Sequence, residues 1–82
     1  MNNLAILLEI GAYVYAIVAL AAALAVFGAA WGIGGIGKSA MDAIARQPES
    51  AGNVRSSMII AGALVEGATL FAIVVCILAV LK

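Results

Sequence analysis

Glu66 is the only charged residue in the run from Ser56 to Leu81, which is otherwise almost entirely apolar. As a helix rising about 1.5 Å per residue, this run is long enough to cross a hydrocarbon core of about 30 Å, and Glu66 lies about 16 Å along its axis from Arg55. An ionised carboxylate at such depth costs about 2.5–3.5 kcal/mol even on lenient insertion scales. A carboxyl group at this position therefore indicates part of an ion or proton pathway.

Three kinds of chemistry are open to this carboxyl group. It could pair with a basic side chain, but no basic residue of this chain lies at its depth. It could bind a cation, which wants several oxygen ligands. Thr69, three residues further on roughly the same helix face, offers one hydroxyl. The other neighbours bring no side-chain oxygen: Ile33, Leu64, Gly67, Ala68 and Phe71. The sequence therefore predicts no metal site.

The third possibility is reversible protonation, which we favour. An apolar environment disfavours the carboxylate, so the form of Glu66 that faces lipid is expected to be the neutral acid. The neutral acid still has a proton to donate, and the backbone carbonyl of Leu64 is the expected local acceptor. Release of the proton then requires a wetter or more positive environment, such as an arginine of a partner protein.

The elements that must position Glu66 follow from composition. Of the 82 residues, 67% are apolar, and the mean hydropathy is +1.26. A soluble chain this short would leave much of that apolar surface exposed. Two membrane-length apolar segments flank one polar connector, and no period-two alternation suggests a barrel. We predict an all-α membrane protein, a single antiparallel hairpin of two transmembrane helices. The net charge is zero and there is no basic tract, so we expect no nucleic-acid partner.

The connector is expected to hold the turn. We predict a first helix over about 4–45, a polar loop over about 46–53 and a second helix over about 54–81. Pro48 disfavours the helical conformation at Gln47 and removes a backbone donor. Gly52 and Asn53 are expected to add a second break, with Ser50 or Asn53 capping the second helix. Basic residues gather near the connector, so the positive-inside rule places the loop in the cytoplasm and both termini across the membrane.

Small residues on the first helix predict an oligomer. Two stripes at spacings of three and four lie on nearly opposite faces. One stripe contains Ala21, Ala25, Gly28, Gly32 and Gly35, and the other contains Ala23, Ala30, Gly34 and Gly37. A dimer needs one such face, whereas two faces predict a close neighbour on each side, as in a homo-oligomeric ring. Equal arm lengths also predict Glu66 at the level of residues 29 and 30.

These features together resemble the proteolipid, or c-type subunit, of the F-type ATP synthase rotor. The resemblance covers nearly the whole chain. It rests on the small-residue motif Gly28-x-Ala30-x-Gly32-x-Gly34, with alanine at one family glycine, on the polar connector Ala45-Arg46-Gln47-Pro48-Glu49, and on Glu66 midway along the second helix.

The resemblance implies a bacterial inner-membrane ring of identical subunits, packed through the small-residue motif, with first helices inside and second helices outside. It implies that Arg46, Gln47 and Pro48 contact the central stalk, made of subunits gamma and epsilon. Each Glu66 would take a proton from subunit a and release it after passing the essential arginine of that subunit. The chain itself would catalyse nothing and hold no cofactor; the proton would be its cargo, and lipid would surround it.

The resemblance also bears on the ion. Sodium-carrying relatives have a glutamine in the first-helix motif, hydroxyl residues just after the carboxylate, and a tyrosine one turn further on. The matching residues here are Ile33, Gly67, Ala68 and Phe71, which lack these oxygens. A proton-carrying ring is therefore expected, with a sodium-carrying ring and a vacuolar-type proteolipid as the alternatives. A holin-like pore and a small drug exporter fit less well, since the chain has neither a strongly charged tail nor more than two helices.

Overall fold

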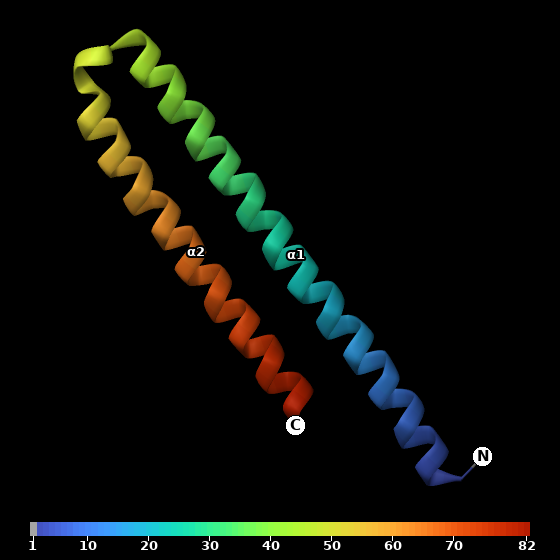
Figure 1. The fold of residues 1–82 in the computed structure, drawn as a ribbon. Coiled ribbons are helices and arrows are strands. Elements are labelled where there is room, and N and C mark those ends of the chain that lie inside the picture. Colours follow the sequence, from blue (N-terminus) through green and yellow to red (C-terminus); the bar gives the residue numbers. More distant parts are fainter. Residues whose placement is uncertain (1) are drawn as a thin grey trace.

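The computed structural model describes residues 2–82 and contains two long helices joined by a tight turn (Figure 1). Helix α1 spans Asn3–Arg46, a short 3₁₀ turn η1 spans Pro48–Ser50, and helix α2 spans Ala51–Leu81. The helices run antiparallel, and their Cα atoms extend over 70 × 17 × 7 Å along the principal axes. The predicted all-α hairpin is thus confirmed.

Both helices are long and apolar enough to cross a membrane. Each contains a strongly apolar stretch of at least 18 residues with few charges. With 44 residues, α1 is about 66 Å long at 1.5 Å per residue. It continues past the carboxyl end of α2 (Figure 1). The amino-terminal part of α1 is therefore not covered by α2.

The two helices meet along a narrow seam of mostly small side chains. The less exposed positions on α1 between residues 20 and 40 include a series at spacings of three and four: Ala22, Ala25, Ala29, Ile33, Ile36 and Ala40. On α2 the matching set is Val54, Met58, Ala61, Val65, Thr69, Ile73 and Cys76. This alternation keeps one stripe of each helix facing the other. Only Ala40 is buried among the described residues, so the hairpin alone leaves most of its apolar surface uncovered.

The turn is shorter than the sequence predicted. Gln47 leaves the helical region with φ −135° and ψ 76°, as expected before a proline. The Ser50 amide donates to the Gln47 carbonyl at 2.9 Å, which closes the turn within η1. Because Pro48 completes the reversal, α2 begins at Ala51. The predicted loop over 46–53 is therefore too long.

The expectation that Gly52 and Asn53 break the chain is wrong, because both lie inside α2. Of the two candidate caps, Ser50 occupies the capping position, but its side chain makes no capping hydrogen bond.

Candidate ion-binding site

Glu66 lines a groove of about 350 Å³ between α1 and α2, roughly midway along α2. The other lining residues are Val26, Ala29, Ala30 and Ile33 from α1, and Thr69, Leu70 and Ile73 from α2. The groove thus brings Glu66 to the level of Ala29 and Ala30, as the equal arms of the hairpin predicted. All of its walls are aliphatic except for Glu66 and Thr69.

The two oxygen-bearing side chains of the groove differ in their surroundings. Glu66 is exposed at the surface of the hairpin, and the structure gives its carboxyl no hydrogen-bond partner or ion pair within residues 2–82. Thr69 is half-buried, and its Oγ1 donates to the Val65 carbonyl of the same helix at 2.8 Å. The carboxyl group therefore stands in an apolar setting without a fixed counter-charge.

The groove offers few ligands for a metal ion. A hard cation takes about six or more oxygen ligands, or fewer when it keeps its waters. Within residues 2–82, no cluster of three or more histidine, cysteine or acidic side chains is placed to hold a metal. As side-chain oxygen ligands the groove offers the Glu66 carboxyl group and the Thr69 hydroxyl.

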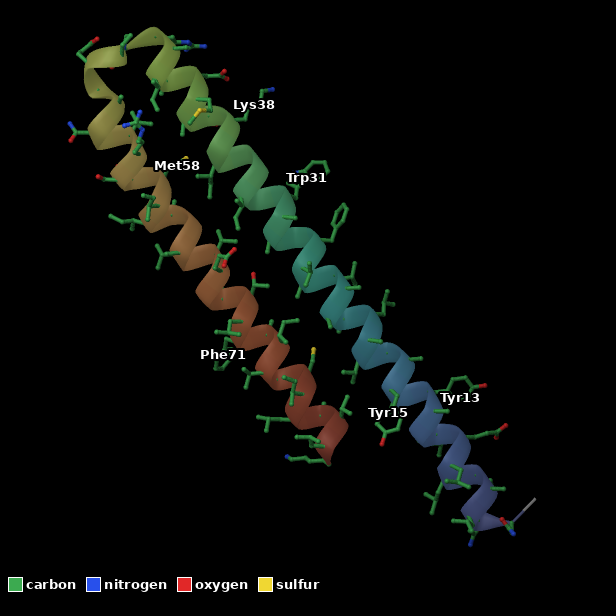
Figure 2. All side chains as sticks on the ribbon, viewed as in Figure 1. Tyr13, Tyr15, Trp31, Lys38, Met58 and Phe71 are labelled. Atoms are coloured by element: carbon green, nitrogen blue, oxygen red, sulfur yellow. The ribbon has the colours of Figure 1, made fainter. Side chains whose placement is uncertain are left out.

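The four residues compared above with the sodium pattern do not lie together in the hairpin. Ile33 lines the groove, whereas Gly67 and Ala68 are exposed outside it. Phe71 is 72% exposed and points away from α1 (Figure 2). Within one hairpin, the position one turn beyond Glu66 thus faces outward and does not contribute to the groove.

Leu64 was proposed to contribute its backbone carbonyl as the acceptor for the Glu66 proton. Its side chain is 72% exposed, and its carbonyl lies within the unbroken helix α2. In such a helix each carbonyl accepts from the amide four residues later. The carbonyl retains a second lone pair, so a bond from Glu66 stays a prediction.

The small-residue motif flanks the seam on both sides. At about 100° per residue, Gly28 lies about 100° from Ala29 to one side, and Gly34 about 100° from Ile33 to the other. Gly32 is half-buried, and Ala30 is exposed at the edge of the groove. A Cβ added at any of the three glycines would meet nothing within 4 Å. The hairpin by itself therefore does not need glycine at these positions.

The connector residues lie at the closed end of the hairpin (Figure 1), and Glu66 is about 22 Å further along α2 at 1.5 Å per residue. Arg46, Gln47 and Pro48 are all exposed. Lys38, on α1 nearby, points away from α2 (Figure 2). The structure therefore separates the turn from the Glu66 groove and leaves its side chains free for a partner.

Some walls of the groove were not anticipated from the sequence. Val26, Leu70 and Ile73 were not singled out, although a signal for them existed. Val26 and Leu70 follow Ala25 and Thr69 of the seam, and Ile73 belongs to the seam itself. Extending the three-four spacing along both helices would have indicated this wall.

The fold and the groove define a class of small two-helix membrane proteins with one carboxyl group midway along the second helix. Comparison with known families agrees with this class: the model of the ATP synthase C-subunit family matches residues 16–79. The chain belongs to this family.

Curated relatives of this chain are named as the same subunit of ATP synthases. The chain is 67% identical over 60 residues to the ATP synthase c-type subunit of Phocaeicola vulgatus, and 63% identical over 60 residues to that of Bacteroides thetaiotaomicron. Each alignment covers 73% of this chain and 71% of the relative. A more distant relative, from Ruminiclostridium cellulolyticum, is 42% identical over 67 residues, which cover 78% of this chain and 88% of the relative. No solved structure matches the chain.

Proposed function

We propose that this chain is a proton-carrying subunit of an ATP synthase rotor ring, and that Glu66 is its proton-binding group. The observation that carries the proposal is the groove itself, in which one carboxyl group, without a partner in residues 2–82, lies among aliphatic side chains and Thr69. An ionised carboxylate is costly inside a bilayer, so in this proposal the group crosses the lipid-facing part of its path only with a proton bound. The sequence suggests the Leu64 carbonyl as one candidate acceptor for this proton.

The exchange of protons is proposed to take place against subunit a. Protonated Glu66 enters from lipid, loses its proton beside the arginine of that subunit, and is reloaded from the opposite side of the membrane. One charge that crosses about 100 mV releases about 2.3 kcal/mol, so several protons are needed for each ATP. A ring of many subunits delivers these protons one at a time as it turns.

The ring is supported by the surfaces that the hairpin leaves open. Gly28 and Gly34 flank the seam on opposite sides, with open space where a side chain would be. Small residues on both flanks allow a second copy of the chain to approach closely on each side. Each hairpin then has two like neighbours, which closes a ring of identical subunits.

The orientation is proposed from charge. Lys38, Arg46 and Arg55 lie toward the turn, whereas Lys82 alone lies at the other end. The positive-inside rule then places the turn in the cytoplasm of a bacterial cell, with the chain in the inner membrane. In that orientation Arg46, Gln47 and Pro48 face the central stalk subunits gamma and epsilon.

The proposal is tested by carbodiimide labelling of the protein in native membranes, with and without sodium, read by mass spectrometry. This reagent modifies protonated carboxyl groups in apolar sites. We expect modification at Glu66 that fades as the pH rises and is indifferent to sodium. Protection by sodium would instead indicate a sodium-carrying ring, in which backbone and water oxygens complete a cation site. Absence of labelling at every pH would contradict the carrier role.

The role of the turn is tested by Gln47→Ala. We expect the stalk and catalytic head to co-purify poorly with the ring, and ATP synthesis to fall several-fold, because an exposed polar contact is removed. Carbodiimide labelling of Glu66 should be unchanged, since the turn lies far from the groove. Asn53→Ala, just past the turn, is the matched control. Normal retention of the head by the Gln47 variant would remove this residue from the stalk contact.

A further inference from the structure

The hydroxyl of Thr69 already donates its proton in a hydrogen bond within α2. Its Oγ1 donates to the Val65 carbonyl at 2.8 Å, and the side chain is half-buried in the same groove as Glu66. A hydroxyl has one donor and two acceptor lone pairs. With the donor used within α2, only the accepting capacity of Thr69 remains for the groove.

Protonated Glu66 needs a hydrogen-bond acceptor. As a neutral acid it has one O–H that must be donated, and an unsatisfied donor is costly in an apolar setting. Thr69 lies three residues on, a spacing that makes side chains neighbours on a helix. Among the residues that line the groove it carries the only other side-chain oxygen, and α1 contributes aliphatic side chains alone. No titratable or charged side chain besides Glu66 lines the groove from either helix within residues 2–82.

We infer that Thr69 is a positioning residue for the carrier: its Oγ1 accepts the hydrogen bond of protonated Glu66 while its own proton stays on the Val65 carbonyl. This inference rests on the proposed function. The relay Glu66 O–H to Thr69 Oγ1–H to Val65 carbonyl holds the loaded carboxyl against α2. It also supplies an acceptor in a chain whose Phe71 has no hydroxyl and points out of the groove (Figure 2).

The relay makes a prediction with a definite sign. A hydroxyl that turns only its lone pairs to the groove stabilises the acid and disfavours the carboxylate. Removing it in Thr69→Val, a substitution of similar shape, should therefore lower the pH at which carbodiimide labelling of Glu66 is half-maximal. Loss of one hydrogen bond of ordinary strength corresponds to about a two- to twelvefold loss in proton affinity.

The experiment measures Glu66 labelling against pH in native membranes for the wild-type chain, Thr69→Val and Thr69→Ser. Serine keeps a hydroxyl that can make the same two bonds, so it should restore the wild-type midpoint, which a purely steric role of Thr69 would not predict. Ser56→Ala removes an exposed hydroxyl from the same helix and should change nothing. The oligomer seen on a mildly denaturing gel confirms that each variant assembles.

Two outcomes would overturn the inference. An unchanged midpoint in Thr69→Val would leave the Leu64 carbonyl as the acceptor. A raised midpoint would mean that the hydroxyl donates to the carboxylate instead. In either case the proposed function stands as long as wild-type Glu66 is labelled in a pH-dependent way. Wild-type Glu66 that resists labelling would refute the carrier role itself, so the two failures are distinguishable.

Discussion

Glu66→Gln is expected to abolish proton-driven ATP synthesis while the ring still assembles. Glutamine has nearly the shape of the protonated acid, so it should fit the same groove between Ala29, Ala30 and Ile33. Its amide does not ionise at physiological pH, so it cannot release and rebind a proton as a carboxyl group does, and the carrier step is lost entirely. Synthesis should fall to background in inverted membrane vesicles, and carbodiimide should no longer label the chain at this position.

Glu9→Gln is the matched control for this substitution. Glu9 is an exposed carboxyl on α1, far from the groove, and its loss removes the same charge from the chain. We expect normal synthesis in this variant. Retained synthesis in Glu66→Gln would show that another group carries the proton. A lost ring would mean that Glu66 holds the helices together, which its lack of a partner within the described hairpin argues against.

Much of the site could be read from the sequence because its strongest signal is energetic. A single acid in a long apolar run is costly wherever the helix ends lie, so Glu66 stood out without any knowledge of the packing. Glu66 was expected opposite Ala29 and Ala30 because these residues and Glu66 are about equally far from Pro48 along the two helices. Both inferences depend on where the charges lie in the sequence and on distances along the helices. Folding into a hairpin changes neither.

The details that depend on rotation about a helix axis were harder to obtain. The sequence located the glycine-rich zone beside Glu66, yet the side chains that face α2 there are Ala29 and Ile33, and Gly34 flanks them. Phe71 was considered as a neighbour of Glu66, and it points outward instead. Spacing gives relative angles within one helix. Only packing fixes which face meets the partner.

The turn was misjudged for a different reason. Glycine and asparagine are common breakers, and Gly52 with Asn53 suggested a long loop. No described residue of the turn has a positive φ, so the chain never uses the freedom of glycine there. Pro48 and the short η1 turn complete the reversal first, and the next residues enter the helix.

Gly34→Leu is expected to prevent ring formation while leaving the hairpin intact. Leucine forms helices better than glycine, so the substitution does not weaken α1 on its own. A Cβ at this position meets nothing within 4 Å in the single hairpin, so α2 is not displaced either. In a ring the same side chain would fill the space needed for close backbone approach of the next protomer. The native mass in mild detergent should fall from that of a large ring to that of small species.

Gly11→Leu separates this effect from a general intolerance of bulk. Gly11 also lies on α1 with open space around its Cβ, but it is outside the small-residue motif, so this variant should keep the ring. A ring that survives Gly34→Leu would place that flank of α1 against lipid and not against a neighbour. Loss of helical circular dichroism in Gly34→Leu would instead show that the hairpin itself depends on the glycine. That result would contradict the expectation from the open space around Gly34. The pair of variants thus tests whether the glycines are needed for the fold of one hairpin or for packing between protomers. The open space beside the glycines on both sides of the seam favours packing between protomers.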